Sequence, residues 1–329
     1  MGRRARLFSG LAVSLTLIGA GCTAPAPELA AFGTSAFEPQ EIRETRLGQI
    51  MWRLAVSNAD ICPLTRPSAG WVLQSANQYS GELKRAAQRH YGLRGDLPGV
   101  LVAPTGSPAA RAGLAPGDLI LAVNGERLAV GSESGEGAYE GLKQNAARLN
   151  DAIARAPAVL TVRRGDEVRE IALSPVPSCA YHAELHDGGS MVTREGVILI
   201  SERMERLART EDELAFVVAH EMSHLVLEHD RGPAVRGERG AANDAINLRR
   251  GRFPGYEADA DRMALYLLAR AGYDARAAAD YLTREADTGP SISLASGAIY
   301  RSPPERRRAL EAVIEDIAAR RDAGRDLIP

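Results

Sequence analysis

A glutamate beside the first of two closely spaced histidines is the arrangement in this sequence with the clearest chemical meaning. The run His220-Glu221-Met222-Ser223-His224 places the two imidazoles four residues apart. On an α-helix this spacing puts them on one face, about 40° apart around the axis, so both can reach one metal ion. Glu221 stands where a carboxylate can take a proton from an attacking water. The spacing therefore predicts a zinc site for hydrolysis.

Two histidines leave such a site incomplete, because a catalytic zinc ion takes three protein ligands and keeps one open position. Downstream, Glu257 and Asp261 stand four residues apart and would share one face of a helix. Asp259 is about 200° round the helix from Glu257 and should face away. Zinc accepts a carboxylate together with two imidazoles, and an acid nearby can orient an imidazole. One acid of the pair is expected to bind the metal and the other to support it.

Both motifs are expected on helices. Residues 210–213 (TEDE) form a capping box before an apolar run, which predicts a helix over about 211–229. The acid pair predicts a second helix over about 256–271, which ends at Gly272. The other elements expected in this half are a hairpin with strands at 191–193 and 196–201, and three helices at 201–209, 274–285 and 304–321. The Arg and Glu residues of the last helix are interpreted as a solvated face.

Histidines at helical spacing can also be purely structural. The capping box and the acid pair favour a metal site for His220 and His224. His229 follows His220 by nine residues, which places it on the opposite side of a continuous helix, so it is interpreted as structural. The Arg- and Gly-rich segment 231–255 joins the two motif helices and is a natural candidate for a mobile cover.

The first half of the chain has short apolar strands between Gly- and Pro-rich turns. In the run GSPAARAGLAPGDLILAVNG, Ser-Pro starts a short helix and Asn-Gly closes the strand at 119–123. A helix is predicted at 139–155, and strands are predicted at 99–102, 159–163 and 168–173. The region 71–175 resembles a bacterial PDZ domain. That resemblance implies a β-rich module that binds an extended peptide at a sheet edge, with Tyr91-Gly92-Leu93 as the candidate carboxylate loop. A PDZ-shaped module without a peptide site is the alternative.

The pattern of residues 1–21 predicts a lipoprotein-type signal peptide. Three arginines precede an apolar stretch that is too short for a membrane span. Small residues before Cys22 resemble a bacterial lipoprotein box, which implies a lipid on Cys22; simple cleavage with a free Cys22 is the alternative. The Ala- and Pro-rich residues 22–39 are expected to form a tether, and an amphipathic helix should follow over 40–64.

The other cysteines indicate the cellular compartment of the protein, and its net charge limits the class of partner. Cys62 and Cys179 form an even pair, which in an exported protein predicts a disulfide that staples the ends of the PDZ-like region. A small metal cluster of Cys179, His182 and His186 is the rival interpretation. With 40 basic and 42 acidic side chains, the net charge is −2, which argues against a nucleic-acid partner.

The two motifs together carry a family resemblance. HExxH on one helix and ExxAD on a later one, within DELAFVVAHEMSHLVLEHD and YEADADRMALYLLARAGYD, resemble the HtpX and CAAX-prenyl-protease family of zinc endopeptidases. The resemblance implies that Glu257 is the third ligand of one Zn²⁺ per chain and that Asp261 lies beside the site. It implies an α+β fold with a mainly helical zincin-type domain and a small sheet over 180–329. The whole chain resembles the exported, PDZ-carrying lipoprotein branch.

These features predict a zinc-dependent endopeptidase of the bacterial cell envelope that acts on misfolded or specific envelope proteins. It is expected to be periplasmic and lipid-anchored to the outer membrane, with its substrate along the strand at 197–200. An envelope chaperone or assembly factor with a latched site is the alternative. The family's His before a Pro-Glu-Arg run is missing ahead of 304–306, and Tyr300 or Arg301 is the candidate substitute as oxyanion donor.

Overall fold

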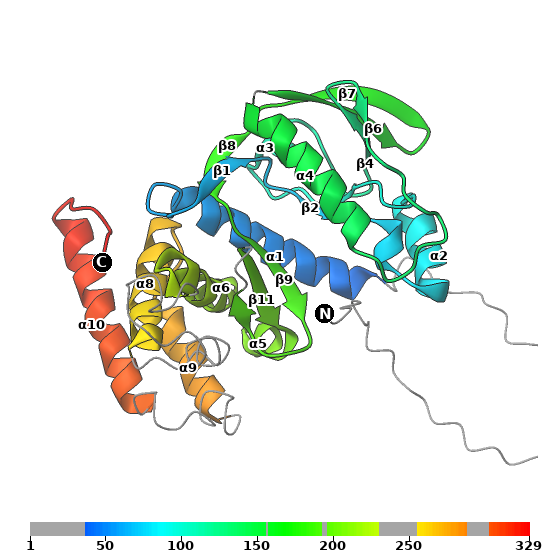
Figure 1. The fold of residues 1–329 in the computed structure, drawn as a ribbon. Helices are drawn as coiled ribbons and strands as arrows, with labels where there is room; N and C mark the ends of the chain where they lie inside the picture. Colours follow the sequence, from blue (N-terminus) through cyan, green and yellow to red (C-terminus); the bar gives the residue numbers. More distant parts are fainter. Residues whose placement is uncertain (1–36, 156, 193–195, 230–254, 288–302) are drawn as a thin grey trace, which may run out of the picture.

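The computed structural model describes residues 37–155, 157–192, 196–229, 255–287 and 303–329. The expected signal peptide, Cys22, most of the tether, Tyr300 and nearly all of the segment 231–255 lie outside these residues. Among the described helices, none combines the length and the apolar character needed to cross a membrane. The chain forms a β-rich part and a mainly helical part, with the long helix α1 (Glu38–Ser57) between them (Figure 1).

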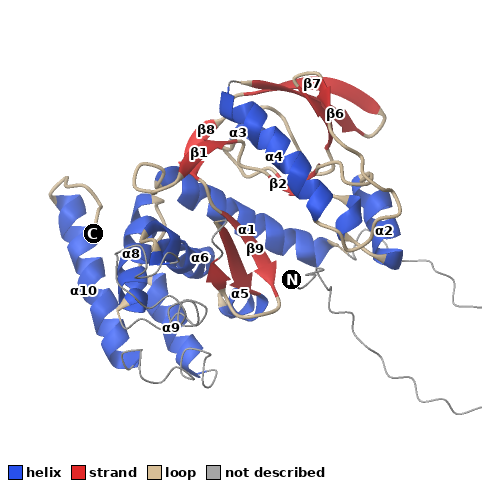
Figure 2. Cartoon of the chain, viewed as in Figure 1, coloured by secondary structure: helices blue, strands red, loops and turns tan. Residues whose placement is uncertain are grey.

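The β-rich part is built on a six-stranded antiparallel sheet in the order β2-β3-β4-β6-β7, with β5 paired to β4. Figure 2 shows its strands β2, β6 and β7 beside helix α4. Its strands are β2 (Val72–Gln74), β3 (Gly99–Val102), β4 (Leu119–Val123), β5 (Glu126–Arg127), β6 (Ala158–Arg164) and β7 (Glu167–Leu173). Asn124 and Gly125 have φ values of 50° and 79°, which provide the twist that the tight hairpin between β4 and β5 requires. The four strands predicted in this region are observed as β3, β4, β6 and β7, which form the centre and one edge of the sheet.

Three helices belong to the β-rich part: α2 (Gly81–Tyr91), α3 (Pro108–Arg111) and α4 (Glu140–Arg155). The predicted helices at the Ser-Pro start and at 139–155 are observed as α3 and α4. Ser107 caps α3, because its Oγ accepts a hydrogen bond from the backbone N–H of Ala110 at 3.1 Å. Helix α2 and the edge strand β2 are not predicted by the sequence pattern.

Helix α1 packs against both parts of the molecule. Three of its apolar residues are buried in the core of the helical part: Leu47, Ile50 and Leu54. Gly48 lies against the sheet, where an added Cβ would be only 3.1 Å from Cγ2 of Val72, so the small residue permits the close approach. The helix ends at Ser57, earlier than expected, because the Asn58 side chain donates a hydrogen bond to the Leu54 carbonyl at 2.8 Å.

A disulfide joins Cys62 to Cys179, whose Cα atoms are 5.6 Å apart. Beside it, β1 (Thr65–Ser68) pairs antiparallel with β8 (Val176–Cys179), so the two ends of the β-rich part meet at one place. The bond uses the sulfur of Cys179, so the alternative metal cluster with His182 and His186 is wrong.

The helical part contains a three-stranded sheet in the order β10-β11-β9. The predicted strand at 196–201 is observed as β11 (Val197–Ser201), which pairs in parallel with β9 (His182–His186) and antiparallel with β10 (Met191–Val192). This central place contradicts the expectation that substrate binds along β11, because strands on both sides already use its backbone groups. Among the described strands, β10 and β9 form the edges of this sheet, where a peptide could be added.

The helices of this part are α5 (Glu202–Leu207), α6 (Glu211–Val226), α8 (Tyr256–Arg270), α9 (Ala277–Asp287) and α10 (Pro303–Asp322). Helices α6 and α8 pack against each other, and α9 and α10 pack on them (Figure 1). All six consecutive residues at 214–219 of α6 are buried, so this helix is enclosed on every side rather than amphipathic. The enclosed helix is a rigid platform for the side chains at its C-terminal end.

Candidate metal centre

The capping box predicted at the start of α6 sets where the helix begins. Oγ1 of Thr210 accepts a hydrogen bond from the backbone N–H of Glu213 at 3.2 Å. The carboxylate of Glu213 accepts one in turn from the backbone N–H of Arg209 at 2.6 Å. These bonds satisfy donors that the first helical turn leaves without partners. From this fixed start, the His-Glu-x-x-His run occupies the last turns of α6.

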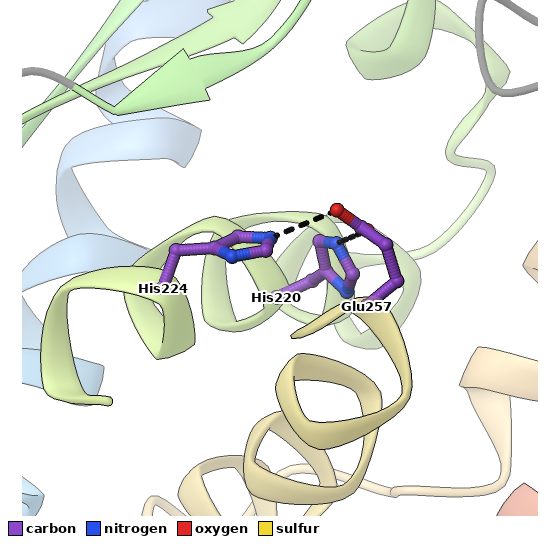
Figure 3. Close-up of side chains that lie close together, drawn as sticks. All are labelled: His220, His224 and Glu257. Atoms are coloured by element: carbon purple, nitrogen blue, oxygen red, sulfur yellow. Dashed lines mark hydrogen bonds and ion pairs between the residues drawn. The ribbon is translucent and has the colours of Figure 1, made fainter. Parts of the chain in front are cut away.

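The two histidines of α6 and Glu257 of α8 converge on one point (Figure 3). Nε2 of His220 is 3.1 Å from one carboxylate oxygen of Glu257, and Nε2 of His224 is 3.6 Å from the other. A zinc ion about 2.0–2.1 Å from tetrahedral ligands would hold those atoms about 3.4 Å apart. The two distances bracket that separation, and the donor set of two nitrogens and one oxygen suits zinc. Among the described residues, no other group was found that could hold a metal ion.

Asp261 lies behind His220 and is itself held by Arg306 of α10. Nδ1 of His220 is 2.9 Å from Asp261, and Arg306 donates two hydrogen bonds to the same carboxylate at 2.6 and 2.8 Å. Burial alone would raise the pKa of Asp261, but the charge and hydrogen bonds of Arg306 and His220 hold that pKa well below its usual range. Asp261 is therefore a permanent anion that accepts the Nδ1–H of His220 and directs Nε2 toward the centre.

The two imidazoles differ in their affinity for protons. Burial would lower the pKa of His220, but hydrogen bonds to Asp261 and Glu257 raise it to about 10. Burial and the positive charge of His220 lower the pKa of His224 to about 3. Without a metal ion, His220 thus carries a proton between two carboxylates, whereas His224 is neutral.

Glu221 directly follows His220 on α6, and its carboxylate is buried. Burial raises its pKa to about 7. A carboxylate with a pKa near neutrality is suited to exchange a proton with a reacting group. Asp259, in contrast, is exposed, as its place on the helix predicted.

The structure brings two further residues to the centre that the sequence interpretation placed elsewhere. The charge pattern predicts a solvated face for Arg306 on α10, but its guanidinium packs against Asp261 and the side chain is only 19% exposed. The Pro-Glu-Arg run at 304–306 was the available signal. His229 was assigned to the far side of a continuous helix, but α6 ends at Val226 and the chain turns, so that Nδ1 of His229 is 3.0 Å from Nδ1 of His224.

Two family models match separate parts of the chain. A model of peptidase family M48 matches residues 188–237. The matched region contains the two histidines and Glu221, and the match indicates a metallopeptidase. A PDZ domain model matches residues 99–147, within the β-rich part. The chain thus combines a PDZ-like β-rich region with a peptidase-like region.

Solved structures match only part of the chain, as one example shows. The crystal structure of the HtrA3 PDZ domain bound to a phage-derived ligand is 20% identical, covers 34% of this chain and 88% of its own, and has a TM-score of 0.25. No curated protein matches the chain.

Proposed function

We propose that this protein is a zinc-dependent endopeptidase with a PDZ module for docking its substrate or a partner. The observation that carries the proposal is the convergence of His220, His224 and Glu257, with Glu221 adjacent on the same helix. A bound zinc ion would supply Lewis-acid polarisation of the scissile carbonyl and of the attacking water. The M48 match over the first motif supports the same reaction class.

The other steps of the proposed reaction are assigned to individual residues of the chain. Glu221 takes a proton from the attacking water and then passes it to the leaving amine. Asp261, held by Arg306, keeps the ring of His220 in the orientation that presents Nε2 to the centre. Glu257 adds a negative charge to the ligand set, which leaves a bound Zn²⁺ with a net single positive charge.

The substrate is proposed to run along β10. Among the described strands, β10 pairs only with β11, and it packs beside α6, which carries the catalytic glutamate. An extended peptide paired with β10 would use backbone hydrogen bonds that are largely independent of side chains. That geometry suits an enzyme that accepts unfolded segments of varied sequence.

The PDZ module offers a second edge, at β2. Among the described strands, β2 pairs only with β3, and residues 69–71 precede it. The candidate carboxylate loop Tyr91-Gly92-Leu93 lies elsewhere, at the C-terminal end of α2. We therefore propose that a docking peptide adds to β2, and that residues 69–71 take the place expected for that loop.

The proposed location is the cell envelope, with Cys22 as a lipid anchor in the outer membrane and the enzyme in the periplasm. The disulfide between Cys62 and Cys179 supports an oxidising compartment, because such bonds are rare where thiols are kept reduced. The apolar N-terminal stretch that ends at Cys22 supports export.

A chaperone or assembly factor with a latched site is the second candidate. The side chains of the three proposed ligands are each only 12–13% exposed, which favours a site that needs opening. Cleavage of an unfolded protein such as casein by the purified chain, abolished by a chelator and restored by zinc, is the result expected for the enzyme. Zinc binding without any cleavage of casein or of envelope proteins would favour the chaperone.

A further inference from the structure

His224 has to present one particular ring nitrogen to the proposed zinc site, on which this inference rests. Its Nε2 faces Glu257 at 3.6 Å, so a metal ion held there takes the lone pair of Nε2. The proton of the neutral ring is then on Nδ1, on the other side of the imidazole. Because the side chain is largely buried, this N–H needs an acceptor within the protein.

His229 stands where that acceptor is needed. The Nδ1 atoms of His224 and His229 are 3.0 Å apart, and their ring centroids are 5.2 Å apart. We infer that His229 is a positioning residue whose Nδ1 accepts the Nδ1–H of His224 and so fixes the tautomer and orientation of that ligand. The arrangement is the counterpart of Asp261 behind His220, but with a neutral acceptor in place of an anion.

Two features of the chain hold the ring of His229 in place. Glu228 has a φ of 55°, a left-handed conformation that is costly for a residue with a side chain, and this turn brings His229 back toward α6. The ring of His229 stacks on Tyr256, with centroids 4.0 Å apart and planes within 4° of parallel. Tyr256 directly precedes Glu257, so the stack joins the end of α6 to the first turn of α8.

The two contacts of His229 can be separated by substitution. His229→Phe keeps an aromatic ring to stack on Tyr256 but removes the acceptor. His229→Asn removes the ring but places an amide oxygen near the former position of Nδ1. Zinc affinity of each purified full-length variant, measured by competition with a chromophoric chelator, is the primary readout. Loss of an outer hydrogen-bond partner typically weakens metal affinity about 10–100-fold.

We expect His229→Phe to bind zinc at least about tenfold more weakly than the wild type, and His229→Asn to stay within about threefold of it. His90→Phe, which removes a ring nitrogen from α2 in the β-rich part, is the matched control and should bind zinc like the wild type. Equal affinities of His229→Phe and the wild type, or equal losses in both His229 variants, would overturn the inference. A wild-type protein that binds no zinc would instead refute the proposed function.

A second measurement needs no substitution and so does not depend on how the variants fold. In wild-type protein with ¹⁵N-labelled histidine, a scalar coupling across an N–H···N hydrogen bond should connect the Nδ1 atoms of His224 and His229. We expect the coupling in the zinc-loaded protein, with the proton covalently attached to His224. Absence of this coupling from the zinc-loaded protein, or a proton attached to Nδ1 of His229, contradicts the inference.

Discussion

Arg306 donates two hydrogen bonds to the carboxylate of Asp261, from Nε at 2.6 Å and from Nη2 at 2.8 Å, across the interface between α10 and α8. This contact links the last long helix of the chain to the centre, because Asp261 is also the partner of His220. The C-terminal helix is thus part of the support of the proposed metal site rather than a separate appendage.

Removal of the guanidinium should weaken both the fold and the site. In Arg306→Met the buried carboxylate of Asp261 loses its cation, and breaking a buried ion pair in this way typically costs about 3–5 kcal/mol. We expect a lower free energy of unfolding by denaturant, and zinc affinity reduced about tenfold or more. Arg307→Met is the matched control, since Arg307 is exposed and pairs only with Glu311 among the described contacts. Equal behaviour of the two variants would show that Asp261 does not need Arg306.

Loss of the proposed catalytic carboxylate should abolish peptide hydrolysis without loss of metal binding. Glu221→Gln keeps the shape of the side chain but cannot accept the proton, so kcat should fall by about 10³-fold or more while zinc stays bound. Zinc content and kcat/KM of the variant, compared with Asp259→Asn on the exposed side of α8, provide the check. Cleavage at the wild-type rate by Glu221→Gln would exclude Glu221 as the catalytic base.

Zinc binding should release a proton from His220. The pKa of this imidazole is raised to about 10 in the metal-free fold, and that of Glu221 to about 7. At about pH 8.5, His220 is protonated and Glu221 is ionised, so binding should release about one proton, from Nε2 of His220. Calorimetry in buffers of different ionisation enthalpy measures that number. A value near zero would mean that His220 is already neutral in the metal-free protein.

The same raised pKa makes a prediction for stability. Because the pKa of His220 in the fold lies above the ordinary histidine value of 6.5, its contribution to stability is complete below about pH 6.5 and is lost as the pH rises through 10. The melting temperature of the metal-free protein should therefore fall between neutral pH and pH 10 by more than that of the zinc-loaded protein. An equal fall in both forms would contradict the assignment of the proton to His220.

Reduction of the disulfide should destabilise the fold. The bond between Cys62 and Cys179 spans a sequence separation of 117 residues, for which loop-closure entropy gives about 4–5 kcal/mol. Urea unfolding of a Cys62→Ser/Cys179→Ser variant should show a reduced midpoint. The same midpoint in the variant and the oxidised protein would mean that the paired strands β1 and β8 hold this junction without the bond.

The sequence by itself determined the local features of this protein. The capping box at Thr210 and the four-residue spacing of the histidines depend only on helix geometry, and so they predicted α6 and the shared face of His220 and His224. The hairpin at Asn124 and Gly125 and the disulfide between the even pair of cysteines were likewise predicted from local sequence and composition. Helices α3, α4, α8 and α10 were predicted for the same reason.

Only the tertiary structure decided which distant groups meet. The helical period placed His229 on the far side of α6, but a helix that stops at Val226 and a left-handed residue at Glu228 bring it back to His224. The charge pattern placed Arg306 in solvent, but packing of α10 on α8 buries it against Asp261. Pairing on both sides of β11 removed it as a substrate edge. Helix ends, strand neighbours and buried ion pairs arise from contacts between segments far apart in the chain, which no local pattern encodes.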